Sequence, residues 1–219
     1  MIPRSAPPGQ GRTNGSRRRG DALSSDAGRQ WRRALHRLAL SCAAALACLG
    51  WTAAQPAAAD PPSEGLLHEA KIGLLHHDTG GLWSGFRRED GLDISLELQF
   101  SRHWEVLGGR LRPALGATIN TAGDTSKAYL DARWQYDFEA GPFVAFGLGA
   151  AVHNGDLAPR SADRKALGSR VLFHIPLEIG FRFAGRHSVS AYFDHVSNGF
   201  LADFNEGQDT IGVRYGIRF

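Results

Sequence analysis

The feature that most constrains this chain is a hydrophobic period of two residues, which recurs after Asp60 in successive segments of about ten residues. In the clearest segment, near 170–183, apolar residues alternate with His174, Glu178 and Arg182. Side chains two positions apart share a face of a β-strand but not of a helix. The pattern therefore predicts a chain of β-strands and nearly excludes helices.

The same alternation predicts eight strands, which is the smallest even number found in bacterial outer-membrane barrels. Besides the segment near 170–183, it occurs near 68–78, 92–101, 110–119, 127–137, 143–153, 187–197 and 211–219. The connections at 79–91, 154–168 and 198–208 are long, those at 138–142 and 184–187 are short, and that at 120–126 is shorter than expected. Long loops alternating with short turns favour an all-β fold, namely an eight-stranded antiparallel transmembrane β-barrel of the outer membrane.

The direction in which the apolar face points separates this fold from a soluble, lipocalin-like barrel with its apolar face inside. Opposite charges on the other face, such as Glu178 and Arg182, could pair across a narrow lumen. Aromatic residues near strand ends resemble the girdles at membrane interfaces. They are Trp134, Tyr136, Tyr192, Phe193, Tyr215 and the C-terminal Phe219. Both observations favour the membrane barrel.

The first 59 residues are predicted to be separate from the barrel. Residues 1–30 are rich in Gly, Arg, Ser and Pro, which indicates a disordered leader or a start codon placed too far upstream. Residues 31–59 are typical of a cleaved signal peptide, with basic residues, an apolar stretch and the site Ala57-Ala58-Ala59. A membrane anchor and a lipoprotein modified at Cys48 are the disfavoured alternatives. Residues 60–219 would then be the barrel domain of an exported protein.

Charge and cysteine content exclude several classes of function. The first 59 residues hold nine of the 25 basic and two of the 22 acidic residues, which leaves 16 basic and 20 acidic residues after them. A barrel of net charge −4 offers no basic face for nucleic acid. The two cysteines, Cys42 and Cys48, precede the barrel, so disulfides, thiol nucleophiles and cysteine metal sites are not expected.

Three polar residues stand out near the end of the chain. His195 and Ser197 are two apart and share the apolar face of their strand, and Asp209 shares the apolar face of the next. If the hairpin register places His195 opposite Asp209, their Cβ atoms are about 5 Å apart. Such an arrangement predicts a Ser-His-acid hydrolase site facing the lipid, with N–H groups of Asn198 and Gly199 as oxyanion donors.

The stretch His195-Val196-Ser197-Asn198-Gly199, then 205–209 and the final 212–219, resembles the lipid A 3-O-deacylase family, the PagL-like acyloxyacyl hydrolases. Two diffuse matches, 74–78 and 89–94, extend the likeness over most of residues 66–219.

The resemblance implies an outer-membrane esterase that hydrolyses the 3-hydroxyacyl ester at position 3 of lipid A without a cofactor. It assigns Ser197 as nucleophile, His195 as base and Asp209 as acid, with Asn198 and Gly199 near the oxyanion. Two departures from the family leave Glu206 as an alternative acid. Here the acid is an aspartate where the family typically has glutamate, and Asn205-Glu206-Gly207 replaces Asn-Pro-Gly.

The remaining expectations concern partners. Lipid A and membrane lipid are the expected partners, and a homodimer is left open. No metal site is predicted, because the His76-His77 pair lacks a third spaced ligand and is typical of a polar surface. Basic residues in or beside the outer loops could contact lipid A phosphates or simply be solvated; they are Arg87, Arg88, Lys127, Arg160, Arg164 and Lys165. A non-catalytic structural or adhesive barrel is the alternative function, and it would gain support if Asp209 could not reach His195.

Overall fold

The computed structural model describes residues 65–219 apart from residue 86. The predicted leader, the predicted signal peptide and both cysteines lie outside the described residues. In the described part of the chain, no helix has the length and apolar character needed to cross a membrane.

Nine strands account for the regular secondary structure of residues 65–219. In chain order they are β1 (Leu67–His76), β2 (Leu92–Phe100), β3 (Trp104–Val106), β4 (Gly109–Asn120), β5 (Lys127–Asp137), β6 (Pro142–His153), β7 (Val171–Phe183), β8 (His187–Ser197) and β9 (Gln208–Arg218). All but β3 correspond to segments with the predicted alternation. The short β3 has only three residues and was not predicted.

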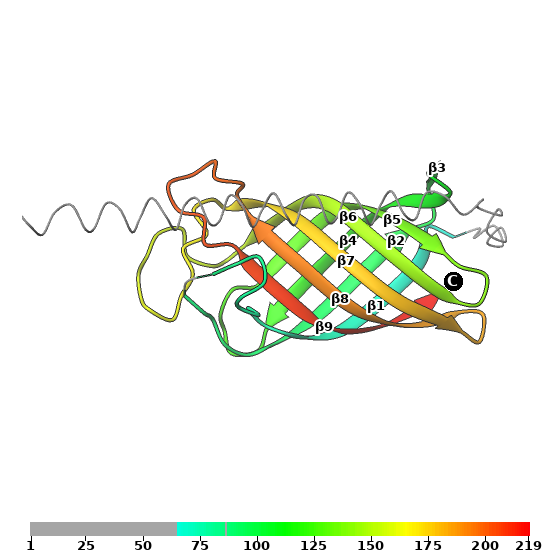
Figure 1. Cartoon of the computed structure of the whole chain (residues 1–219), viewed down its shortest axis with the longest axis horizontal. Helices are drawn as coiled ribbons and strands as arrows, with labels where there is room; N and C mark the ends of the chain where they lie inside the picture. The colour runs from blue at the N-terminus through cyan, green and yellow to red at the C-terminus, as the bar shows by residue number, and fades with distance from the viewer. Residues whose placement is uncertain (1–64, 86) are drawn as a thin grey trace, which may run out of the picture. The chain divides into compact units, whose positions relative to one another are not determined.

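Eight of these strands close into an antiparallel barrel (Figure 1). Each main strand pairs with its neighbour in sequence, and β1 pairs with β9 to complete the circle. The pairing of β2 with β4 passes over β3, which forms a small hairpin with the start of β4. The predicted eight-stranded fold is therefore confirmed.

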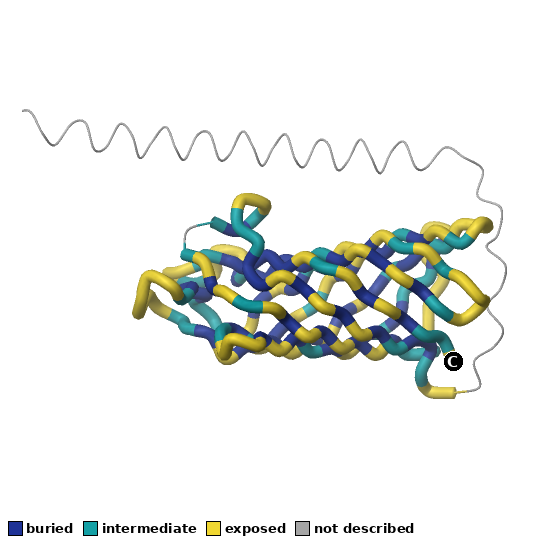
Figure 2. Tube along the Cα trace, turned by 90° about the horizontal axis from the view of Figure 1, so that it is seen from below, coloured by how far each residue is buried: buried dark blue, intermediate teal, exposed yellow. Residues whose placement is uncertain are grey.

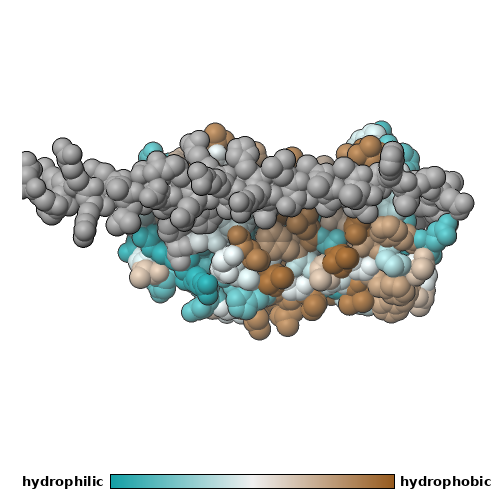
Figure 3. Space-filling model, in the orientation of Figure 1, coloured by the Kyte–Doolittle hydropathy of each residue, from teal (hydrophilic) through white to brown (hydrophobic). Residues whose placement is uncertain are grey.

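The apolar face of each strand points outward. In β2, Leu92, Ile94, Leu96 and Leu98 are exposed, whereas the residues between them are buried. The resulting alternation of buried and exposed positions runs along the strands in Figure 2. On the face shown in Figure 3, hydrophobic side chains gather over the strands and hydrophilic ones lie toward the end with the long connections. The soluble-barrel alternative is wrong, because it requires the apolar face inside.

The lumen is filled by paired charges. Glu178 accepts hydrogen bonds from Lys71 at 2.9 Å and from Arg133 at 2.6 Å, and all three side chains are buried. Arg182 bonds instead to Asp137 at 2.8 Å, so the suggested pair of Glu178 with Arg182 is not formed. Opposite charges next to one another offset the desolvation free energy of burying them. Charged side chains can therefore fill the interior of the barrel in place of apolar ones.

One aromatic residue of the predicted girdles lies inside the barrel. Tyr192 is buried, and the Arg214 guanidinium lies 4.1 Å from its ring centroid. It has the parity of its inward-facing neighbours Ser190 and Asp194, not that of Phe193. The girdle prediction was therefore wrong for Tyr192, because parity along a strand decides the face more strongly than residue type.

Four connections lie at the end of the barrel where β8 ends and β9 begins: 77–91, 121–126, 154–170 and 198–207. The C-terminus and the shorter turns lie at the opposite end (Figure 1). These connections contact one another and bring residues far apart in sequence together; for example, the backbone N–H of Lys165 donates to Glu89 Oε1 at 3.0 Å. Two of the basic residues expected either to contact lipid A phosphates or to be solvated are instead buried: Lys127 pairs with Asp194 at 2.5 Å, and Lys165 pairs with Asp78 at 3.2 Å.

Candidate active site

The hairpin of β8 and β9 sets the geometry of the candidate site. In its antiparallel register, His195 lies directly opposite Asp209. His195 Nδ1 is 2.7 Å from Asp209 Oδ1, a charge-assisted hydrogen bond in which the ring nitrogen donates. This bond leaves His195 Nε2 as the ring nitrogen available for proton transfer.

The connection 77–91 holds the other side of the Asp209 carboxylate. Its Oδ2 atom accepts backbone N–H groups from Trp83 at 2.6 Å and Ser84 at 2.5 Å, while the N–H of Thr79 donates to the Asp209 carbonyl at 2.7 Å. The Trp83 ring also packs against His195, with 4.8 Å between ring centroids. A single loop thus orients the acid and covers one side of the base.

This loop changes the surroundings expected for the outward-facing polar groups. The parity of His195 and Asp209 is that of the outer wall, as predicted, yet their exposed fractions are only 8% and 0%. The connection 77–91 covers these two residues and shields them from direct contact with lipid. Cover by backbone donors offsets the penalty that an ionised group would suffer against hydrocarbon.

Ser197 lies two residues beyond His195, on the same face and half-buried. In the β7–β8 register it is opposite Phe173. Within residues 65–219, the Ser197 hydroxyl forms no hydrogen bond, so the structure brings together His195 and Asp209 but not Ser197 and His195. Hydrogen bonds of catalytic groups are often long before substrate binds.

A hollow of about 340 Å³ lies near Ser197, since its lining includes Asn198, the next residue, and Phe173, the partner of Ser197 in the β7–β8 register. Its lining is mainly apolar and comes from β6, β7 and the two neighbouring connections: Ala150, Gly168, Ser169, Val171, Leu172, Phe173, Asn198, Leu201 and Ala202. The small side chain of Ala150 lies opposite Phe173 in the β6–β7 register. The hollow therefore offers an apolar surface beside the serine.

The two residues expected at the oxyanion differ in what they can offer. Asn198 donates its backbone N–H to Asn205 at 2.9 Å, and its side-chain amide donates to the carbonyls of Leu167 at 2.9 Å and Phe204 at 2.5 Å. With its N–H groups engaged in holding loops together, Asn198 is not placed as an oxyanion donor. Gly199, with φ +66°, continues the chain past the serine and keeps its backbone N–H as the candidate donor.

The structure also separates the two candidate acids. Glu206 accepts from Arg87 at 2.5 Å and from the backbone N–H of Ala166 at 2.8 Å, so it joins loops and does not contact His195. Next to it, Gly207 has φ +63°, and a Cβ added there would lie 3.1 Å from His195 Cε1. Gly207 therefore allows the loop to pass close to the imidazole.

Sequence reasoning missed three contributors to this site: Trp83, Ser84 and Gly207. A tryptophan within a polar connection was the available signal for the first. The other two act through backbone, and the sequence pattern carries no signal for that.

His77 was assigned to a polar surface, but it is buried at the mouth of the lumen, 2.8 Å from Asp93 and 3.2 Å from Glu89. Among the residues described, no cluster of three or more His, Cys, Asp or Glu side chains is arranged to hold a metal ion.

Comparison with known proteins places this chain in a family. A family model described as Lipid A 3-O-deacylase (PagL) matches residues 83–218. Among solved structures, the outer membrane enzyme PagL is similar with a TM-score of 0.53 and 22% identity, over 69% of this chain and 99% of that chain.

Two further barrels match less well. A de novo designed transmembrane β-barrel gives a TM-score of 0.46 at 6% identity, over 73% of this chain and all (100%) of that chain. Neisserial surface protein A gives 0.44 at 10% identity, over 69% and 96%. No curated protein matches the chain significantly. The likeness to the PagL structure shows a shared outer-membrane barrel fold, and because the family model spans more than half of the sequence, this chain belongs to the PagL family of lipid A 3-O-deacylases.

Proposed function

We propose that this chain is a serine esterase of the bacterial outer membrane that removes the 3-hydroxyacyl chain from position 3 of lipid A. The observation that carries the proposal is the hydrogen bond between His195 and Asp209 on the outward face of the barrel. A histidine-carboxylate pair supports ester hydrolysis when a nucleophile lies beside it. The alternative of a non-catalytic barrel would gain support if Asp209 could not reach His195, but the two side chains are hydrogen-bonded.

The proposed reaction begins with attack of Ser197 Oγ on the ester carbonyl carbon while His195 Nε2 accepts the hydroxyl proton. Asp209 holds the tautomer of His195 and stabilises the imidazolium that forms. The N–H of Gly199 faces the developing oxyanion. Collapse of the tetrahedral intermediate breaks the ester bond, and the sugar hydroxyl leaves with the proton from His195.

Water then completes the cycle. His195 removes a proton from water, the resulting hydroxide attacks the acyl-serine, and the free 3-hydroxy fatty acid departs as Ser197 regains its proton. Binding of substrate is proposed to bring Ser197 Oγ within hydrogen-bond reach of His195 Nε2, as catalytic contacts commonly tighten in the complex. The hollow lined in part by Ala150 would take the acyl chain, since its lining is mainly apolar and includes Phe173 and Asn198, the neighbours of Ser197.

Mass spectrometry of lipid A from cells that express the chain tests this function. Wild-type protein should produce lipid A that lacks one 3-hydroxyacyl chain, whereas Ser197→Ala should leave lipid A intact. Ser161→Ala, in an exposed part of the 154–170 connection, is the matched control and should behave as wild type. Intact lipid A with folded wild-type protein in the outer membrane would refute the proposal.

A further inference from the structure

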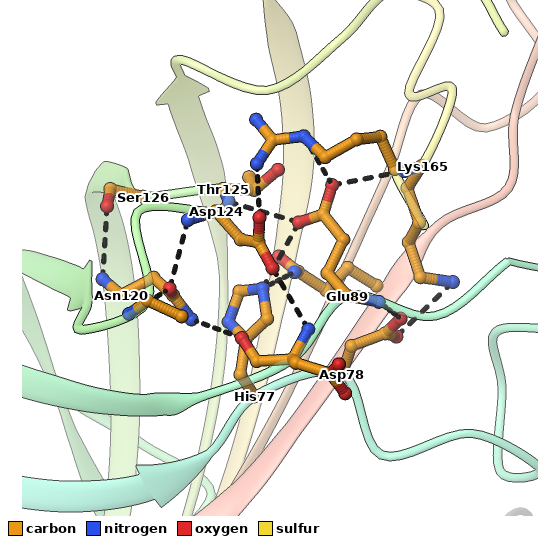
Figure 4. Close-up of polar contacts among 12 residues, drawn as sticks. His77, Asp78, Glu89, Asn120, Asp124, Thr125, Ser126 and Lys165 are labelled. Atoms are coloured by element: carbon orange, nitrogen blue, oxygen red, sulfur yellow. Dashed lines mark hydrogen bonds and ion pairs between the residues drawn. The ribbon is translucent and has the colours of Figure 1, made fainter. Parts of the chain in front are cut away.

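The connection 77–91 supplies both backbone donors to Asp209 Oδ2 and the ring that covers His195, yet its described residues, all but 86, form no strand or helix. A segment of this kind has no hydrogen-bond ladder of its own to fix its conformation. Its position must therefore come from contacts made by its side chains and by neighbouring loops. Those contacts converge on the buried cluster shown in Figure 4.

The two ends of the connection are tied to each other. The backbone N–H of Glu89 donates to Asp78 Oδ2 at 3.0 Å, and the N–H of His77 donates to the Gly91 carbonyl at 3.3 Å. Asp78 has φ +48°, a left-handed conformation that aspartate tolerates better than most residues. The tight corner at Asp78 and the bond to Glu89 close the neck of the loop.

A second loop grips the connection through Lys165. Its Nζ lies 3.2 Å from Asp78 Oδ1 and donates to the carbonyl of Gly85 at 3.1 Å, one residue after Ser84. Its backbone N–H donates to Glu89 Oε1 at 3.0 Å. Lys165 thus fixes the neck and the middle of the connection at once, and Figure 4 shows its side chain reaching toward Asp78.

Glu89 joins this loop to a third one and to the barrel. Its Oε2 accepts the backbone N–H of Thr125 at 3.0 Å and lies 3.2 Å from His77 Nε2. On its other side, His77 Nδ1 bonds to Asp93 of β2 at 2.8 Å. We call His77, Asp78, Glu89 and Lys165 the loop clamp; all four are buried.

Hydrogen bonds within the loop clamp favour the charged forms of His77 and Glu89. Burial alone would lower the pKa of His77, but hydrogen bonds to Asp93 and Glu89 outweigh burial and raise that pKa to about 9. Burial alone would raise the pKa of Glu89, but the bond from His77 and those from Thr125 and Lys165 lower it to about 2. At neutral pH the clamp therefore holds an imidazolium against a carboxylate.

The protonation of His77 also connects the clamp to the strand that carries Asp209. The side-chain amide of Gln208, the residue before Asp209, lies 2.8 Å from His77 Nε2. The amide atom nearest His77 is the nitrogen Nε2; because a protonated imidazole has no acceptor, the amide would turn its oxygen toward His77 in that state. That orientation also gives a partner to Gln208 Oε1, which otherwise has none within the described residues.

We propose that Glu89 and Lys165 are positioning residues of the active site: the loop clamp holds the connection 77–91 so that the N–H groups of Trp83 and Ser84 fix Asp209 and, through it, His195. The inference rests on the proposed esterase function. It assigns a use to buried charges whose role in stability alone would be served as well by apolar side chains. A small displacement of a positioned catalytic group costs about 10²-fold in rate. Movement of the loop clamp should therefore lower the rate of catalysis.

The test compares Glu89→Gln, which keeps the shape of the side chain and removes its charge, with wild type in detergent micelles containing lipid A. Asp137→Asn is the matched control, since Asp137 is a carboxylate with arginine partners at the opposite end of the barrel. Lys165→Met is the second clamp variant. Steady-state kinetics and the low-field ¹H signal of the His195 Nδ1 proton, assigned with His195→Gln, are both measured on barrels shown to be folded by their heat-modifiable mobility.

Both clamp variants should lose about 10- to 100-fold in kcat with KM changed less than about 3-fold. They should also broaden or lose the His195 signal, while Asp137→Asn retains both. Unchanged kcat with an intact signal would overturn the inference, and so would failure of both clamp variants to fold, which would make the clamp a folding requirement. If wild type proves inactive on lipid A, the proposed function fails, but the His195 signal still reports whether the clamp positions Asp209.

Discussion

Asp209 lies directly opposite His195 in the β8–β9 ladder, and its two carboxylate oxygens serve different partners. Oδ1 receives the imidazole Nδ1, and Oδ2 receives two backbone N–H groups from a loop more than 100 residues earlier in the chain. The acid is therefore held from both sides, by its own hairpin and by the connection 77–91.

Replacing Asp209 with asparagine should lower kcat on the order of 10³-fold while the barrel still folds. The amide cannot stabilise the imidazolium, and its NH2 group would meet either the backbone donors or the imidazole donor. Deacylation of lipid A in micelles by purified Asp209→Asn measures the effect.

Two comparisons make the Asp209 result specific. Asp203→Asn, in the exposed part of the 198–207 connection, should retain wild-type kcat. Glu206→Gln should cost less than about 10-fold, because Glu206 joins Arg87 to Ala166 and does not contact His195. A larger loss for Glu206→Gln than for Asp209→Asn would instead identify Glu206 as the acid.

Adding one methyl group at Gly207 should disturb His195. A Cβ there would lie 3.1 Å from His195 Cε1, and the backbone φ of +63° adds strain of about 1–2 kcal/mol for a non-glycine residue. We expect Gly207→Ala to lose at least about 10-fold in kcat. Gly185→Ala is the control, since Gly185 has φ +72° with nothing within 4 Å of the added Cβ. Equal effects of the two substitutions would show that strain, not contact with His195, matters.

Filling the hollow beside Ser197 should change the preference for acyl chains. Ala150→Phe adds side-chain volume to the lining of the hollow without altering the outward apolar character of β6. We expect kcat/KM for long acyl chains to fall by about 10-fold while folding is unaffected. The measurement is a competition between lipid A species of different chain length, analysed by mass spectrometry.

Ala117→Phe provides the matched control for the hollow. Ala117 also has the parity of the outer wall, on β4, where it is half-buried, and it is not part of the hollow's lining. It should leave the chain-length preference unchanged. An identical response of the two variants would place the acyl chain elsewhere.

The stability of the connection 77–91 should depend on pH in a defined direction. The raised pKa of His77, about 9, means that its contribution is fully present below about pH 6.5 and is lost as the pH rises through about 9. The lowered pKa of Glu89, about 2, means that its contribution is present above about pH 4.5 and is lost as the pH falls through about 2. Asp78 opposes this, since burial raises its pKa.

Hydrogen exchange of the Trp83 and Ser84 amides, corrected for intrinsic rates, measures this dependence. Protection should be greatest between about pH 4.5 and 6.5 and should decline on the alkaline side toward pH 9. His77→Gln should abolish the alkaline decline. Persistence of the same decline in His77→Gln would assign it to another group.

The sequence by itself determined the strands, their outward faces and the shared parity of His195, Ser197 and Asp209. These features are local, because a period of two residues specifies both the extended backbone and the face of each side chain. For the same reason a simple parity argument would have placed Tyr192 inside. The pairing of His195 with Asp209 depends only on the register between β8 and β9, which are neighbours in sequence.

Only the tertiary structure decided what surrounds that pair. Trp83 and Ser84 donate backbone N–H groups to Asp209. The side-chain amide of Asn198 donates to the carbonyl of Leu167 in another loop, and Lys165 is buried against Asp78 and not solvated. Loop conformations depend on contacts between segments distant in sequence, and no periodic pattern encodes them. The barrel could thus be inferred from alternation alone, whereas the support of its candidate acid could be found only where the connections 77–91, 121–126 and 154–170 meet.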